Sequence, residues 1–136
     1  MQPKDVEKII TYWQLTAKHD YDTMLSLFES KRYSDCLFYG HIVLEKILKG
    51  LVVKEIKTPA PYLHDLVRLQ ELAKLGLSEK ELDLLDAVNE FNIRSRYPEQ
   101  KLNFYKQCTR PYTQKYLKEI VSLYQKLCQM LKSKTS

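Results

Sequence analysis

One stretch, residues 33–55, limits the folds available to this chain more than any other feature. It reads YSDCLFYGHIVLEKILKGLVVKE, and its apolar residues recur at helical spacing around a face wider than a surface helix needs. A helix of this kind must be buried on two sides, at the centre of a domain. Gly40 and Gly50 each cost about 1 kcal/mol relative to alanine in a helix interior, and we expect them to pack closely against another backbone. The apolar face is formed by Leu37, Leu44, Ile47, Leu48 and Leu51, widened by Ile42, Val43 and Val52.

The rest of the chain shows the same period. Apolar residues three and four apart predict further amphipathic helices. Ser30 or Ser34 is expected to cap the central helix, and Ser78 with Glu81 forms a capping box. Residues 97–108 are expected to form a loop. The expected helices span about residues 6–28, 33–55, 64–75, 79–96 and 111–131, and Gly76 stops the third of them.

This pattern predicts an all-α fold, an up-and-down antiparallel four-helix bundle with an additional short helix. The length of 136 residues fits a single domain, residues 1–136. Only 3 glycines and 5 prolines leave little room for a turn-rich β architecture. No run of about 20 apolar residues is present to cross a membrane, and the N-terminal MQPKDVEKII lacks the pattern of a signal peptide. We therefore expect a cytoplasmic protein.

Motifs for a metal or a nucleophile are missing from the sequence. The 3 cysteines are far apart with no CxxC pair, and we interpret them as small hydrophobic residues in a reducing compartment. His41 and Glu45 share a helix face, but no HExxH or ExxH pair occurs. No GxSxG or glycine-rich phosphate loop occurs either. We expect no cofactor, no metal and no catalytic residue, and we interpret His41 and Glu45 as a polar seam beside the core.

His64 and Asp65 follow a proline-rich connection and open the short third helix. A carboxylate in the first turn, here that of Asp65, is favourable with the helix dipole. Two interpretations of His64 remain open. It either acts like an N-cap, or it pins the connection to a neighbouring helix.

Arg94 and Arg96 lie in the last turn of the fourth helix, directly before Tyr97 and Pro98. Cations there complement the helix dipole by about 0.3–1 kcal/mol. Residues two apart point about 200° away from each other, so one arginine should face inward and needs a partner. That partner is either a carboxylate, Glu45 or Asp86, or the phosphate of a ligand.

The net charge of +5 is unevenly distributed. Residues 103–136 hold seven basic residues and one acidic residue. A basic helix can attract phosphates. The lysines of this segment spread around the helix, however, and do not form one stripe, so we favour a solvated face.

Three short motifs occur in an order that resembles the HEPN domain. They are the FYGHIVLEKILK segment at 38–49, the proline and His-Asp-Leu turn at 61–69, and Arg-Tyr-Pro at 96–98. The resemblance covers roughly residues 10–130. It implies an all-α bundle, commonly a homodimer with a cleft between subunits. Many prokaryotic members pair with a minimal nucleotidyltransferase, often as toxin–antitoxin modules, and others are metal-independent ribonucleases.

The ribonuclease members carry an arginine followed, four to six residues later, by a histidine. This sequence departs from that pattern, because Tyr97 and Pro98 follow its arginines and no histidine lies beyond residue 64. The resemblance therefore implies a nucleotide- or partner-binding module, with Arg94, Arg96 and Tyr97 lining the cleft. Two lysines of the second helix, Lys46 and Lys49, are expected to add positive potential. A divergent ribonuclease acting on RNA and a purely structural dimer are the alternatives.

Overall fold

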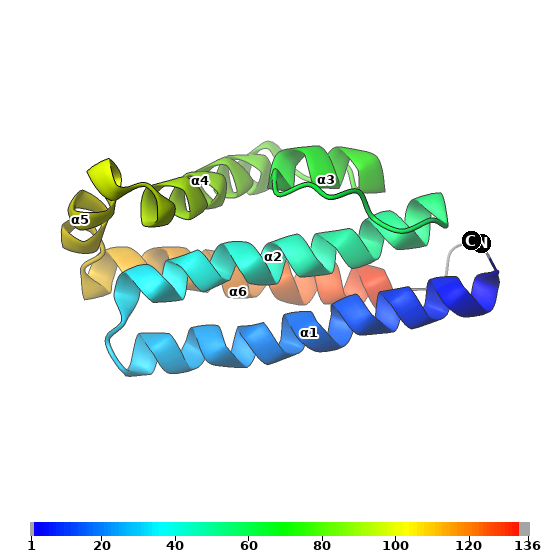
Figure 1. The fold of residues 1–136 in the computed structure, drawn as a ribbon, viewed down its shortest axis with the longest axis horizontal. Coiled ribbons are helices and arrows are strands. Elements are labelled where there is room, and N and C mark those ends of the chain that lie inside the picture. The colour runs from blue at the N-terminus through cyan, green and yellow to red at the C-terminus, as the bar shows by residue number, and fades with distance from the viewer. Residues whose placement is uncertain (1, 134–136) are drawn as a thin grey trace.

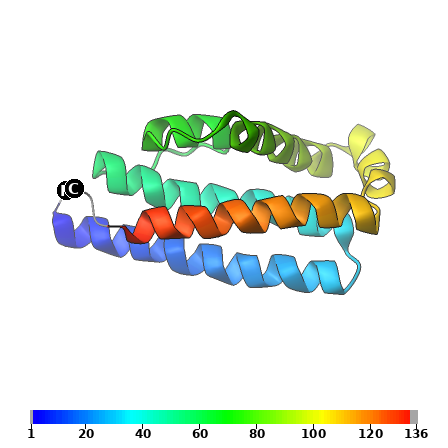
Figure 2. The ribbon, with the colours of Figure 1, turned by 180° about the vertical axis from the view of Figure 1, so that it is seen from behind.

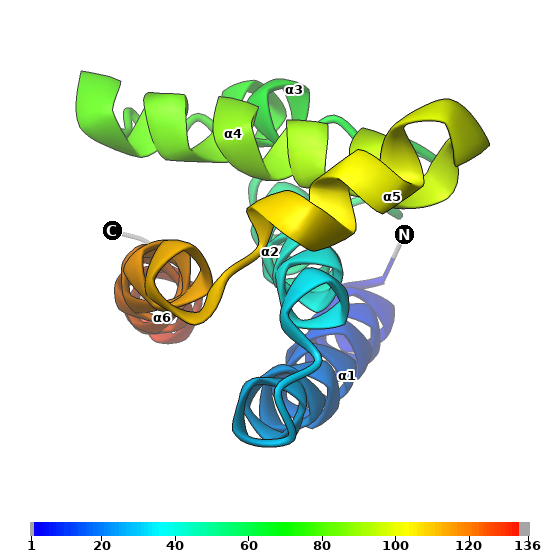
Figure 3. The same ribbon diagram turned by 90° about the vertical axis from the view of Figure 1, so that its left-hand side faces the viewer.

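The computed structural model describes residues 2–133, and within that range the chain is helical with no strand. The all-α bundle expected from the sequence is confirmed (Figure 1). Three long helices run along the length of the molecule, a fourth, residues 79–96, crosses them at an angle, and two short helices complete the fold (Figure 3). The six helices are α1 (Pro3–Glu29), α2 (Tyr33–Ile56), α3 (Leu66–Ala73), α4 (Glu79–Arg96), α5 (Pro98–Gln107) and α6 (Arg110–Lys132).

Helix α2 is the centre of the fold, as its broad apolar face predicts. It contacts α1, α3, α4, α5 and α6. The view along the bundle shows α1 on one side of α2, α3 and α4 on another, and α6 on a third (Figure 3). From behind, α6 runs alongside α2 for most of its length (Figure 2). Burying apolar residues on several faces of one helix stabilises the bundle through the hydrophobic effect.

The two glycines of α2 pack against side chains, so the expectation of a neighbouring backbone is wrong. A Cβ atom built on Gly40 would lie 2.7 Å from Cδ1 of Ile120, on α6. A Cβ built on Gly50 would lie 3.4 Å from Cβ of Trp13, on α1, and 3.5 Å from a methyl group of Leu131. Side chains of α1 and α6 therefore fill the space that each glycine leaves.

Several helix ends follow their sequence signals and others do not. Ser78 and Glu81 make both bonds of the capping box at the start of α4. The start of α2 has no side-chain cap: its N-cap is Arg32, and neither predicted serine serves. Helix α3 ends before Lys74, which takes a left-handed conformation, and not at Gly76. The start of α2 and the end of α3 are therefore set by backbone conformation, and the two serines and Gly76 were misleading signals.

Helix α5 occupies the segment that the sequence was expected to leave as a loop. Pro98 is compatible with the first turn of a helix, because the missing amide hydrogen has no intrahelical partner there. Tyr97 is extended and separates α4 from α5. Phe104 and Cys108, four residues apart, are both buried and hold the short helix against the core. Two buried residues are too few to give a recognisable period in the sequence.

None of the described helices is long and apolar enough to cross a membrane.

Candidate functional site

A polar cluster joins α2 to the connection between α2 and α3. The Nδ1 atom of His64 lies 2.9 Å from Oε1 of Glu45, and the Lys49 ammonium donates to Oε2 of the same carboxylate at 3.1 Å. Nε2 of His41 lies 2.9 Å from the backbone oxygen of His64. Two side chains of α2, His41 and Glu45, thus hold His64, and His64 in turn holds the proline-rich connection against α2.

His41 is only 2 % exposed, and its tautomer follows from its partners. The carbonyl oxygen of His64 can only accept a hydrogen bond, so Nε2 of His41 carries the proton. Burial lowers the pKa of His41 below its ordinary value, partly opposed by the charge of Glu45, while the charges of His64 and Arg96 lower it further. His41 is therefore neutral at pH 7 and serves as a hydrogen-bond donor inside the fold.

His64 is oriented differently, because its ring is half exposed. Its Nδ1 atom donates to the Glu45 carboxylate, which leaves Nε2 as the basic nitrogen of the neutral ring. The ring lies at an open groove of about 530 Å³ between the connection and α4. The groove is lined by His41, His64, Asp65, Asp86, Asn89, Glu90, Asn92 and Ile93. A carboxylate-oriented histidine at a solvent-accessible groove can accept a proton from a bound molecule.

Asp65, not His64, is the N-cap of α3. Its Oδ1 atom accepts from the backbone amides of Val67 and Arg68 and from Nδ2 of Asn89 at 2.9 Å. The Oδ1 atom of Asn89 in turn accepts from the amide of Leu66 at 3.1 Å. Asn89 thus clamps the start of α3 to α4. The sequence carried no signal for this residue, because its partners lie 23 and 24 positions away.

The two arginines at the end of α4 have different surroundings. The guanidinium of Arg94 lies 5.1 Å from the ring centre of Phe104 and donates to the side chain of Gln107, both on α5. Arg96 is exposed, and within residues 2–133 it makes no hydrogen bond or ion pair. In the same range neither arginine pairs with Glu45 or with any other carboxylate. The inward arginine is therefore Arg94, and its partner is an amide that the sequence placed in a loop.

Tyr97 follows directly and is 52 % exposed. Its extended backbone directs the chain from α4 into α5. Arg96 and Tyr97 together form a corner of the bundle with a free guanidinium and an accessible aromatic ring.

The two predicted lysines of α2 do not join this corner. Lys46 pairs with Asp20 of α1 at 2.5 Å, and Lys49 pairs with Glu45. The Lys49 ammonium also lies 5.4 Å from the ring centre of Trp13 and 5.8 Å from that of Tyr62. In the described part of the chain, no contact connects either lysine to Arg94, Arg96 or Tyr97. Their charges are balanced by Asp20 of α1 and Glu45 of α2.

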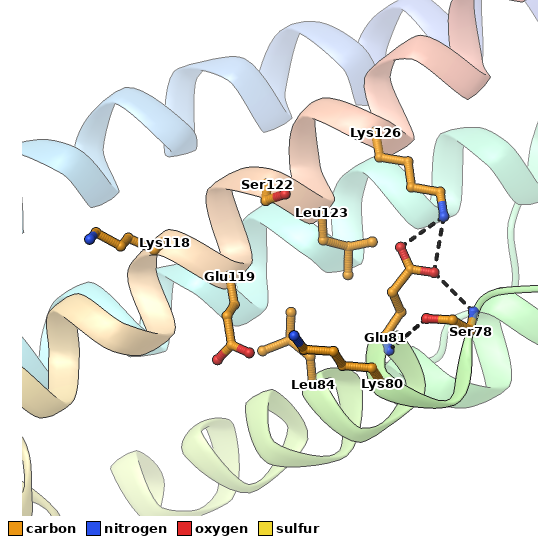
Figure 4. A pocket seen from close by; sticks show the side chains of 9 residues that line it. All are labelled: Ser78, Lys80, Glu81, Leu84, Lys118, Glu119, Ser122, Leu123 and Lys126. Atoms are coloured by element: carbon orange, nitrogen blue, oxygen red, sulfur yellow. Dashed lines mark hydrogen bonds and ion pairs between the residues drawn. The ribbon is translucent and has the colours of Figure 1, made fainter.

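A second groove, of about 500 Å³, lies between the start of α4 and α6 (Figure 4). Its main polar contact is the ammonium of Lys126, which lies 2.8 and 3.0 Å from the two carboxylate oxygens of Glu81. The hydrogen bond from Lys126, followed by that from the Ser78 amide, lowers the pKa of the Glu81 carboxyl. Lys126 and Glu81 satisfy each other's charge across the groove, and this ion pair fastens α4 to α6.

The fold and the site together define a class of protein: a helical bundle with a basic, aromatic corner after α4 and no cluster of metal-binding side chains within residues 2–133. The family model described as HEPN domain matches residues 10–134, and this chain belongs to that family. No curated protein and no solved structure matches the sequence. Membership supports a module connected with nucleotides or RNA in general terms.

Proposed function

We propose that this protein is a nucleotide-binding HEPN module that holds the ligand's phosphates with Arg96 and stacks its base on Tyr97. The observation that carries the proposal is the free, exposed guanidinium of Arg96, followed in the chain by Tyr97 with its accessible ring. A guanidinium forms forked, charge-assisted hydrogen bonds with phosphate, and an aromatic ring offers a stacking face to any base. Arg94 supports the corner by packing on α5.

The test is titration of the purified protein with ATP, GTP, CTP and UTP by calorimetry. Replacing Arg96 with alanine should weaken binding by about tenfold or more, because a hydrogen bond to a charged group contributes about 1.5–3 kcal/mol. Arg68→Ala is the matched control, since Arg68 is also exposed and pairs only with Glu71 in the next turn. Equal affinities for Arg96→Ala and the unaltered protein, or no binding by the latter, contradict the proposal.

The partners are proposals that rest on the family. We propose a homodimer whose cleft contains the Arg96–Tyr97 corner, and a nucleotidyltransferase subunit as a second partner in a prokaryotic, cytoplasmic toxin–antitoxin module. A purely structural dimer is less well supported, because it would pair both arginines with carboxylates, and the contacts of residues 2–133 contain no such pair. Light scattering gives the mass of the particle and distinguishes a dimer from a monomer.

A divergent, metal-independent ribonuclease is the second candidate, and the Glu45–His64 pair favours it. The pair supplies the base that the sequence lacks near its arginines: Nε2 of His64 is free to take the proton of a 2′-hydroxyl group. The carboxylates of Asp86 and Glu90 line the same groove and repel a phosphodiester. For that reason nucleotide binding ranks first.

The ribonuclease is tested with pure protein and RNA in a chelator, over about pH 5 to pH 9. His64→Gln should abolish cleavage, whereas His19→Gln should leave it unchanged, because His19 is exposed on the surface of α1 and, within residues 2–133, its ring pairs only with Asp20. Absence of cleavage by the unaltered protein over the whole range eliminates this candidate.

A further inference from the structure

The outer face of α5 carries apolar side chains that the bundle does not bury. Leu102 is 67 % exposed and Tyr105 is 44 % exposed. They are three residues apart, so they share one face of the helix, while the opposite face places Phe104 in the core, together with Cys108 directly after the helix. A leucine exposed to this extent next to an exposed aromatic residue gives the helix two apolar faces, of which the fold uses one.

Lysines flank this outer face on both sides. Lys106 is four residues after Leu102, and Lys101 is four residues before Tyr105, so each lysine lies beside one of the apolar side chains. Both lysines are exposed, and neither makes an ion pair within the described residues. The free ammonium groups border an apolar stripe.

The surrounding end of the bundle is also basic. The turn between α1 and α2, the end of α4, α5 and the start of α6 meet there (Figure 3). Residues 29–35 and 94–115 hold eight basic and three acidic residues, which leaves fourteen of each in the rest of the sequence. This end therefore carries a surplus equal to the whole net charge of +5. A surplus of this kind attracts acidic partners and speeds their association.

We propose that the outer face of α5 is a docking surface for an acidic segment of another protein that carries an apolar anchor. Leu102 and Tyr105 receive the anchor, and Lys101 and Lys106 pair with the flanking carboxylates. This surface follows the Arg96–Tyr97 corner in the chain, and its proposed role does not depend on nucleotide binding at that corner. An interface with an apolar centre and a charged rim is the usual arrangement in protein complexes.

Two other occupants fit the same surface less well. A single strand of RNA would use the charge and the tyrosine, but an aliphatic leucine offers no stacking face to a base. A second copy of the chain, docked through α5 itself by two-fold symmetry, would bring Lys101 and Lys106 against the same two lysines of the other copy. Only an acidic protein segment satisfies both the exposed leucine and the lysines.

The test begins with selection of random peptides displayed on phage against the whole protein. We expect the enriched sequences to be acidic and to contain leucine or an aromatic residue. The affinity of an enriched peptide, synthesised with a fluorophore, is then measured by anisotropy. The double variant Lys101→Glu/Lys106→Glu and the single variant Leu102→Ala should each bind it at least about tenfold more weakly. Because all three side chains are exposed, the circular dichroism spectrum of these variants should be unchanged.

The matched control is Lys80→Glu/Lys118→Glu, which makes the same charge change at two exposed lysines of α4 and α6. It should alter peptide affinity by no more than about twofold. The proposal is overturned if no acidic peptide is enriched, if the control weakens binding as much as the α5 variants, or if Leu102→Ala only dissociates a dimer. If poly(U) displaces the peptide from the unaltered protein and equally from Leu102→Ala, the surface binds RNA, and this also overturns the proposal. Nucleotide titration of Leu102→Ala, which changes no charge, should match the unaltered protein, and this separates the result from the nucleotide proposal.

Discussion

Replacing Gly40 with alanine should destabilise the protein, although the same change usually stabilises a helix. The added Cβ would lie 2.7 Å from Cδ1 of Ile120, whereas carbon atoms in contact are about 3.5–4.0 Å apart. Ile120 is fully buried, so its side chain has little room to move. Overpacking of this kind costs about 1–3 kcal/mol. The gain in helix propensity is about 1 kcal/mol, so the expected net loss is about 1 kcal/mol.

Gly50→Ala is the internal control, because it makes the same change in the same helix. Its Cβ would meet its nearest neighbours at 3.4 and 3.5 Å, which is ordinary contact. The gain in propensity then remains, and we expect stabilisation of up to about 1 kcal/mol. The propensity term cancels between the two variants, so their difference of about 2 kcal/mol measures the overpacking alone. In melting temperature, 1 kcal/mol corresponds to about 4 °C for a chain of this length.

Urea unfolding followed by circular dichroism measures both stabilities, and a third variant tests the cause. Ile120→Val removes the Cδ1 methyl group that the new Cβ would strike. Alone it should cost about 0.5–1.5 kcal/mol, but it should cost much less in Gly40→Ala, with a coupling of about 1–2 kcal/mol. If Gly40→Ala is as stable as Gly50→Ala, or if the two changes are additive within about 0.5 kcal/mol, the packing argument is refuted.

Three further predictions follow from single residues. Burial lowers the pKa of His41 in the folded protein, so as the pH falls the unfolded chain takes up this proton at a higher pH than the folded chain. The free energy of unfolding should therefore fall as the pH drops below about 6.5. Urea titrations at about pH 5 and pH 7.5 should show a smaller fall for His41→Gln. Ser78→Ala removes one bond of the capping box and should cost about 1 kcal/mol in the same assay. Burial raises the pKa of Cys36 and Cys108 to about 12, so Ellman's reagent should modify Cys128 first in the native protein and all three thiols at similar rates in urea; equal rates in the native protein would contradict the buried positions.

The sequence identified those site residues whose roles are local. Arg96 and Tyr97 stand at the end of a helix because Pro98 disfavours its continuation, and that signal lies within three residues. The partner of Arg94 is Gln107, thirteen positions away, and the sequence offered Glu45 or Asp86 instead. Lys46 and Lys49 share a basic composition with the arginines, yet carboxylates of α1 and α2 neutralise them. Charge is visible in a sequence, whereas its neutralisation depends on contacts between distant residues.

By itself the sequence determined that this protein is an all-helical bundle with one central helix, because apolar periodicity specifies both the type of element and the face it must bury. It also contained the motif order that marks a HEPN domain. Only the tertiary structure decided that residues 98–107 form a helix, since two buried side chains fix it against the core. The tertiary structure likewise paired His64 with Glu45 and left Arg96 free. These features depend on which side chains meet across helices, and local propensity carries no information about that.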